Sequence, residues 1–394
     1  MLECAVTSIY GLVARAARPR WFWRDVVFPF ALSRAALLLV AWFSRYFHAW
    51  HLAPQHAAAR GWLFHPSRML DNWARWDSGW YLAIAREGYL AGPLAGENRI
   101  AFFPAYPALI GGLHRLLPAG WRGTGSLLAI GILLSNAFAV AALALLYRHA
   151  RDLQDEAMAR RAVTYLLAFP TAFFLSCIYT ESLFLFLAVA AFHFAGRGRW
   201  PVAGTMAAVA ALTRPTGVLL FPALAWMALE EARTGARRLL RSVPWLFLAP
   251  ALLGAYALYC WHLTGDVLAV LHVQAGWGKS MSSPWATLFH PRLNNVFVTP
   301  VDGALTALAA VLGIAMLGKL PSRSYGTFTL LSVASFCFSG MLTSAGRYVL
   351  VAFPMFLLLA RAGRNEAFDR AYLLLAGTLQ ALLMAGWVRM YWVG

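Results

Sequence analysis

One carboxylate in this sequence stands among aromatic residues in a way that suits acid–base chemistry. Asp77 lies in the segment 71–89, DNWARWDSGWYLAIAREGY. If this segment forms one helix, the residues that share the face of Asp77 are Trp73, Trp76, Trp80, Tyr81 and Ile84. Arg75 and Arg86 then fall on the opposite face. Desolvation among apolar rings raises the pKa of a carboxyl group unless a cation approaches it, so Asp77 is our candidate general base.

The same pattern has a structural alternative. An interfacial helix also places tryptophans along one face, where they lie at the membrane surface, and Asp77 would then be hydrated. Asp71, at the start of the segment, is expected to cap the N-terminus of the helix.

Three cations elsewhere in the chain are candidates to meet this carboxylate and to bind phosphate. Arg347 precedes an apolar run that begins at Tyr348, and we expect both residues at the site. Arg214 stands at a proline-containing break between two apolar runs, and Lys279 lies in a long polar segment. A guanidinium group binds two phosphate oxygens at once and keeps its charge when partly desolvated. Cations beside apolar runs therefore predict a ligand with a phosphate head and a hydrocarbon tail.

Other side chains near these residues are candidates for substrate binding. Glu181 could orient Asp77, bind a sugar hydroxyl or cap the apolar helix that begins there, and Gln274 could bind the ligand together with Lys279. The rings that could stack on a sugar, or instead anchor the chain at the membrane interface, are Trp80, Tyr81 and Trp277. No metal ion or other cofactor is predicted, because ligand spacing is missing from the four histidines of the first polar segment, His48, His51, His56 and His65.

The composition is that of a membrane protein. Of the 394 residues, 61% are hydrophobic and only 12% are charged, and the mean hydropathy is +0.61. Soluble domains carry about 25% charged residues. The net charge of +17 comes from arginines in short segments between apolar runs, with Lys279 and Lys319 as the only lysines. This distribution indicates topology signals and contacts with lipid headgroups, and it excludes nucleic acid as the expected partner.

The apolar runs predict an all-α polytopic domain over residues 1–394 with about eleven membrane spans. Arginines before the first span hold the N-terminus inside by the positive-inside rule. Alternation then predicts a first outer loop at 48–124 with amphipathic or re-entrant helices, and a second at 263–300. We expect residues 101–118 to form a juxtamembrane or re-entrant helix, because this run is short and bracketed by prolines.

This topology places several charged residues at the same membrane face, although they were not used to assign the topology. The residues that it places at the outer membrane face are Asp77, Glu181, Arg214, Lys279, Arg292 and Arg347. Charges at such depth pair with one another or line a hydrated cavity. We therefore expect a shared outer cavity containing carboxylates and cations.

Several blocks of the sequence resemble a known family. The segments WDSGWYLAIAREGY at 76–89 and FFPAYP at 102–107 resemble the PIG-V family of membrane mannosyltransferases, particularly its bacterial members. Weaker similarity to later blocks of that family is found in YTES at 179–182, ALTRPTG at 211–217, QAGWGK at 274–279 and GRYVLVAFP at 346–354.

The resemblance implies a GT-C fold and an inverting glycosyltransferase of the bacterial cytoplasmic membrane. The implied reaction moves a hexose, with mannose expected, from a polyprenyl-phosphate donor to a lipid, glycan or protein acceptor outside the membrane. The family's acidic residue in the first outer loop acts as base, and this role falls on Asp77.

A transporter or flippase of lipid-linked sugars is the alternative from another class. It would share the apolar spans and the phosphate-binding arginines. Transporters usually contain internal repeats with matched broken helices, and we find no such repeat in the sequence.

Overall fold

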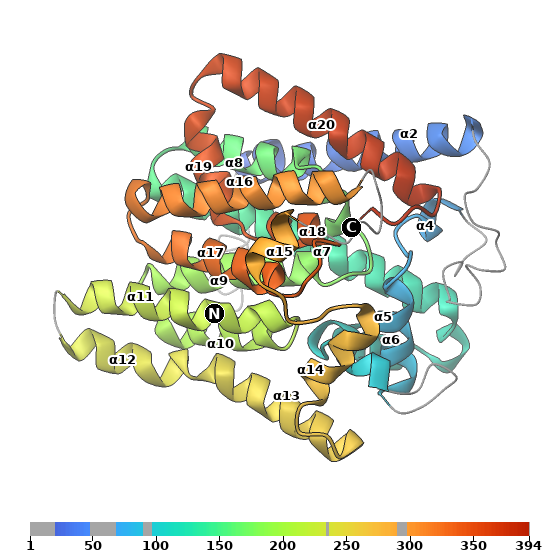
Figure 1. Cartoon of the computed structure of the whole chain (residues 1–394). Coiled ribbons are helices and arrows are strands. Elements are labelled where there is room, and N and C mark those ends of the chain that lie inside the picture. The colour runs from blue at the N-terminus through green and yellow to red at the C-terminus, as the bar shows by residue number, and fades with distance from the viewer. Residues whose placement is uncertain (1–19, 48–67, 90–96, 234–235, 290–297, 394) are drawn as a thin grey trace, which may run out of the picture.

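Helices make up most of the described structure. The computed structural model describes residues 20–47, 68–89, 97–233, 236–289 and 298–393, and these ranges contain no strand (Figure 1). Five helices in them are long and apolar enough to cross a membrane. They are η1 with α2 (Phe22–Val27 and Phe28–Phe47), α7 (Thr124–Leu153), α12 with α13 (Ala236–Leu246 and Leu248–Thr264), α16 (Val298–Lys319) and α20 (Glu366–Val388). The predicted all-helical membrane class is therefore confirmed.

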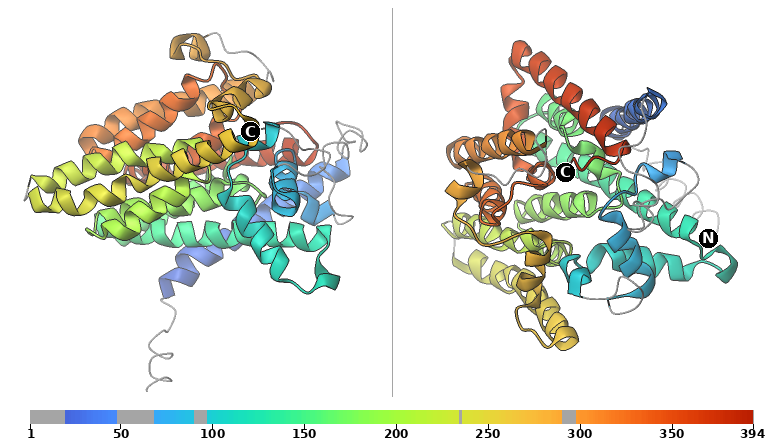
Figure 2. Two further views of the ribbon diagram at one scale, coloured as in Figure 1. Left: turned by 90° about the horizontal axis from the view of Figure 1, so that it is seen from below. Right: turned by 45° about the vertical axis from the view of Figure 1, so that its right-hand side comes forward.

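Shorter helices lie between the long ones. They are α8 (Glu156–Ala168), α9 (Glu181–Ala195), α10 (Trp200–Ala211), α11 (Leu220–Ala232), α17 (Ser324–Cys337) and α19 (Pro354–Ala362). A straight helical span needs about 20 residues, and the longest of these has 15. The predicted number of eleven spans therefore stays a prediction. Figure 2 shows the helices side by side from two further directions, with the light blue and cyan elements that follow α2 in sequence at one end of the left-hand view.

Short helical segments, buried or partly buried in the protein, lie next to the ends of several of these helices. These segments include η4 (Ala172–Leu175), η5 (Pro215–Leu219) and α18 (Ala345–Leu350). Irregular backbone is tolerated at membrane depth only where other protein groups satisfy it. For example, the Gln380 side chain donates to the carbonyls of Leu167 and Phe169, at 2.9 Å each.

The prediction that residues 71–89 form one helix is wrong. Helix α4 (Arg68–Asp71) ends early, and α5 (Ser78–Glu87) begins after a turn in which Trp76 has a φ of +52°. Asp71 does not cap a helix, and it forms a buried ion pair with Arg75 at 2.8 Å. A buried guanidinium needs such a partner, so Arg75 turns inward and the regular helix is interrupted. Asp77 takes the N-cap position of α5 and makes no capping hydrogen bond with its side chain.

The remaining elements fall within the two segments predicted as outer loops. They are η2 (Glu97–Ala101), α6 (Ala105–Leu116), η3 (Ala119–Trp121), α14 (Ala269–His272), η6 (Val273–Trp277) and α15 (Pro284–Phe289). Two of them, η2 and η6, contribute residues to the cavity described below. Helix α6 has 12 residues, about 18 Å of length, which is too short to cross a bilayer core of about 30 Å. It packs closely on α5, since a Cβ at Gly111 would lie 2.3 Å from the carbonyl oxygen of Ala85. Re-entry of α6 into the bilayer stays a prediction, as do the limits of the two outer loops.

Candidate active site

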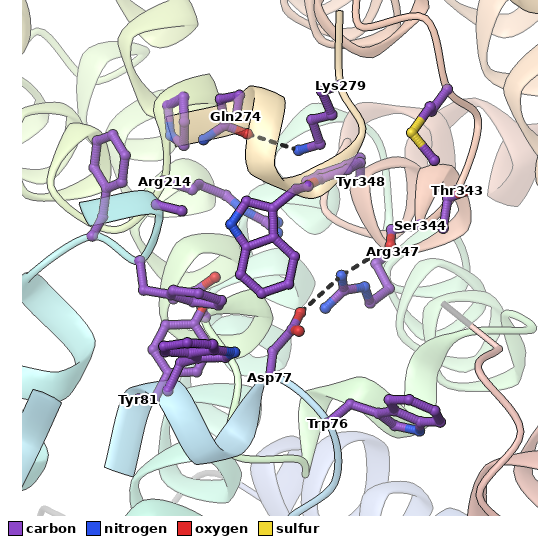
Figure 3. Close-up of a pocket in the computed structure, with 18 of the residues that line it drawn as sticks. Trp76, Asp77, Tyr81, Arg214, Gln274, Lys279, Thr343, Ser344, Arg347 and Tyr348 are labelled. Atoms are coloured by element: carbon purple, nitrogen blue, oxygen red, sulfur yellow. Dashed lines mark hydrogen bonds and ion pairs between the residues drawn. The ribbon is translucent and has the colours of Figure 1, made fainter. Parts of the chain in front are cut away.

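A cavity of about 710 Å³ lies where α5, η6 and α18 meet (Figure 3). Nine of the ten candidate residues line it: Asp77, Trp80, Tyr81, Arg214, Gln274, Trp277, Lys279, Arg347 and Tyr348. The tenth, Glu181, is buried behind the wall. Arg292 and the four histidines from His48 to His65 lie outside the described residues. Segments about 270 residues apart in the sequence thus bring their polar side chains to one place.

Asp77 points into the cavity toward a guanidinium group (Figure 3). Its Oδ2 atom lies 3.4 Å from Nη2 of Arg347, and its side chain is 19% exposed. Burial raises the pKa of Asp77 above its ordinary value; the charge of Arg347 opposes this shift, and the nearby Glu181 adds to it. A carboxylate with a raised pKa is a better proton acceptor than an ordinary one.

Arg347 is shared between two carboxylates. Besides Asp77, it faces Glu181, with 3.8 Å between Nη1 and Oε1. Its Nη2 also donates to the Ser344 hydroxyl at 3.1 Å. Strong charge-assisted hydrogen bonds measure about 2.7–2.9 Å, so neither ion pair of Arg347 is at its optimum. The guanidinium group can therefore bind a further anion.

Glu181 holds the second arginine of the site. It is the first residue of α9 and is fully buried, and the positive end of the helix dipole stabilises a carboxylate there. Its Oε1 accepts from Nη2 of Arg214 at 3.1 Å. Glu181 does not line the cavity and forms ion pairs with Arg214 and Arg347, and the three roles expected for it stay predictions.

Lys279 is the third cation of the cavity wall. Its ammonium group donates to Oε1 of Gln274 at 3.1 Å, and no carboxylate of the described residues lies within ion-pair distance of it. The ring of Tyr348 lies between Lys279 and Arg214, with 5.8 Å and 4.9 Å from its centroid to the two cationic groups. The lining thus carries three cations and one carboxylate, a balance that favours an anionic ligand.

The aromatic side chains in the cavity wall pack against one another. Trp80 stacks on Phe102 with 5.6 Å between ring centroids, and Trp277 meets the Trp80 ring edge-on at 5.8 Å. Tyr81 packs edge-on against Phe102 at 5.2 Å and is buried. Phe102 therefore occupies one face of Trp80, and the use of these rings as sugar platforms stays a prediction.

Sequence reasoning missed three residues that complete the site. Tyr179 bonds to the backbone of Asp77, and Ser344 holds Arg347. Trp392 lines the cavity from the C-terminal end of the chain, with its ring 5.3 Å from the Arg347 guanidinium. Tyr179 belongs to the YTES block and could have been found there, whereas nothing in the sequence marks Trp392.

The described ranges contain no group of three or more His, Cys, Asp or Glu side chains that could hold a metal ion. Metal-independent chemistry stays a prediction.

The solved structures that match this chain include two of an oligosaccharyltransferase from Archaeoglobus fulgidus. One is its complex with zinc and sulfate, with a TM-score of 0.41, 16% identity, and coverage of 75% of this chain and 45% of that one. The other is tethered to an acceptor peptide containing the NVT sequon, with a TM-score of 0.41, 14% identity, and coverage of 75% and 47%. The match spans less than half of the archaeal chain.

Comparison with protein sequences gives a clearer relationship. No curated protein matches the chain. The family model described as mannosyltransferase (PIG-V) matches residues 37–259, a range that includes Asp77, Glu181 and Arg214. Lys279 and Arg347 lie beyond the matched range. Because the match spans more than half of the chain, as the sequence resemblance predicted, the protein belongs to the PIG-V mannosyltransferase family.

Proposed function

We propose that this integral membrane protein is an inverting glycosyltransferase that moves a hexose, mannose by family, from a polyprenyl-phosphate donor to an acceptor hydroxyl. The reaction takes place at the outer face of the bacterial cytoplasmic membrane. Membership of a mannosyltransferase family supports the reaction class. The observation that supports the site best is the single cavity in which the Asp77 carboxylate lies beside Arg347, with Arg214 and Lys279 in the same wall.

The proposed step is one displacement at the anomeric carbon. The acceptor oxygen forms a bond to this carbon as the bond from the carbon to the phosphate oxygen breaks, and polyprenyl phosphate leaves. Asp77 takes the proton of the acceptor hydroxyl, which its raised pKa favours. Arg214, Lys279 and Arg347 neutralise the charge that grows on the leaving phosphate. A phosphate leaves as a stable anion, so a second catalytic acid is not needed.

The arrangement of the charges also supports inversion. Figure 3 shows Asp77 on one side of the cavity and the pair of Lys279 and Gln274 on the opposite side. An inverting displacement needs its base and its leaving group on opposite faces of the sugar. A sugar lying between Asp77 and Lys279 meets this requirement with the leaving phosphate on the Lys279 side, whereas Arg347 lies beside the base, 3.4 Å from Asp77. The cavity, at about 710 Å³, is also within the usual range of about 300–1,000 Å³ for small-molecule sites.

The test uses the full chain purified into nanodiscs, with polyprenyl-phosphate mannose labelled in the sugar and a membrane extract as the source of acceptor. We expect wild-type protein to form a labelled product, identified by mass spectrometry, and Asp77→Asn to lower the rate by about 10²–10⁴-fold, as loss of a general base does. Donor binding to Asp77→Asn should be retained.

Substantial transfer by Asp77→Asn would remove Asp77 from the proposed role. If the protein moves the lipid-linked sugar across the membrane without forming a new glycosidic bond, it is a transporter and not a glycosyltransferase.

A further inference from the structure

We infer that Tyr179 is a positioning residue that fixes the Asp77 carboxylate and the Arg347 guanidinium relative to each other. This inference rests on the proposed function and adds to it. Tyr179 does not line the cavity and is 1% exposed. It contacts both of the charged groups that the proposed reaction uses, through two different parts of its side chain.

The hydroxyl of Tyr179 holds the backbone next to Asp77. It accepts the N–H of Asp77 at 3.1 Å and donates to the carbonyl of Arg75 at 3.1 Å. These two backbone groups flank Trp76, whose φ of +52° is one that residues other than glycine rarely adopt. One hydroxyl therefore bridges both sides of an unfavourable turn. Since the Asp77 side chain makes no capping bond, the direction of its carboxylate depends on this turn and on the long ion pair with Arg347.

The same buried segment supports the turn at a second point. The N–H of Ile178 donates to the carbonyl of Trp73 at 2.9 Å. Removal of the Tyr179 hydroxyl alone therefore should loosen the turn around Trp76 without detaching the whole segment. This makes the contribution of the hydroxyl measurable in a folded protein.

The ring of Tyr179 supports Arg347. The guanidinium carbon lies 4.9 Å from the ring centroid, within the range of a cation–π contact. The ring itself is held in place by Phe174 at 5.3 Å and Trp387 at 5.9 Å between centroids. Because the ion pairs of Arg347 are long, at 3.4 and 3.8 Å, this fixed aromatic face contributes to placing the cation.

Two substitutions separate these contacts. Tyr179→Phe removes the hydroxyl and keeps the ring, so we expect kcat to fall about tenfold with the KM for the donor unchanged, as loss of buried hydrogen bonds predicts. Tyr179→Leu removes both, so the donor KM should also rise, by about fivefold for a lost cation–π contact. If Tyr179→Leu is not monodisperse after purification, Tyr179→Met, whose unbranched and flexible side chain adapts better to an irregular space, takes its place.

Tyr106→Phe is the matched control. Tyr106 is fully buried, and its hydroxyl bonds to the Ser135 hydroxyl at 2.5 Å and to the Gly131 carbonyl at 3.0 Å. It lies outside the cavity lining. Its loss should lower the melting temperature with no change in kcat. Equal losses of kcat in Tyr106→Phe and Tyr179→Phe would overturn the inference.

Hydrogen exchange gives a readout that does not depend on sugar transfer. The peptide containing residues 73–80 should exchange faster in Tyr179→Phe than in wild-type protein, and Tyr106→Phe should leave it unchanged. If wild-type protein transfers no mannose, the proposed function fails while this measurement still decides whether the hydroxyl holds the turn. Unchanged exchange in Tyr179→Phe would refute the positioning role.

Discussion

The buried carboxylate of Glu181 provides the sharpest prediction about the electrostatics of the site. It contacts Arg214 at 3.1 Å and faces Arg347 at 3.8 Å, and its side chain is fully buried. Glu181→Gln keeps the shape and a hydrogen-bonding oxygen but removes the negative charge. Among the described residues, Arg347 then keeps its ion pair with Asp77 at 3.4 Å, and Arg214 keeps no carboxylate within ion-pair distance.

Two effects follow from the loss of this charge. Breaking a buried ion pair from one side costs about 3–5 kcal/mol, and we expect the lower end because glutamine still accepts a hydrogen bond from Arg214. Glu181 also raises the pKa of Asp77. Without it, the pKa of Asp77 falls, the carboxylate becomes a weaker base, and kcat should drop roughly tenfold, less than the ~10²–10⁴-fold cost of losing the base itself.

The assay compares thermal unfolding and mannosyl transfer for wild-type protein, Glu181→Gln and Glu366→Gln. Glu366 is the control because its ion pair with Arg370, at 2.9 Å, is exposed and such pairs contribute about 0–1 kcal/mol. Wild-type stability and wild-type kcat in Glu181→Gln would refute the reasoning that Glu181 stabilises the two arginines and tunes Asp77. An effect equal to that of Glu366→Gln would do the same.

Two further predictions concern pH and the donor phosphate. Because burial raises the pKa of Asp77 and only the ionised form accepts a proton, kcat should fall on acidification at a higher pH than an ordinary carboxyl near pKa 3.9 would give. A kcat–pH profile measures this, and Glu181→Gln should shift its acid limb to lower pH; an unshifted limb would contradict the coupling. Lys279→Met should raise the donor KM by about tenfold, the effect of one lost charge-assisted contact, with a smaller change in kcat. Steady-state kinetics at varied donor concentration check this, and an unchanged KM would remove Lys279 from the phosphate site.

The position of the cavity has a physical basis in the bilayer. Arg214 lies directly before η5 and Arg347 lies in the short helix α18, next to helices too short to cross a membrane alone, and both side chains are buried. Breaks in a helix expose backbone groups, which must be satisfied within the protein at membrane depth. The same breaks turn polar side chains inward. The site is therefore built where regular helix stops.

The sequence by itself determined the helical membrane class, the family and the set of residues that gather at the cavity. Apolar runs must form helices in a bilayer, because no other single segment satisfies its own backbone there. Charges such as Asp77, Arg214 and Arg347 interrupt those runs, and the cost of exposing them to lipid leaves a shared cavity as their simplest location. The four charged candidates that line the cavity, Asp77, Arg214, Lys279 and Arg347, follow this rule.

Only the tertiary structure decided how these residues are paired and held. The break at Trp76 could not be read from helical periodicity, because it depends on a buried ion pair and on the hydroxyl of Tyr179, 102 residues away from Asp77. The partner of Glu181, which is Arg214, and the entry of Trp392 into the cavity likewise depend on contacts between distant segments. A local sequence pattern indicates only which residues share one face of a helix. The orientation of a base and its cations is set by long-range packing, which no local pattern contains.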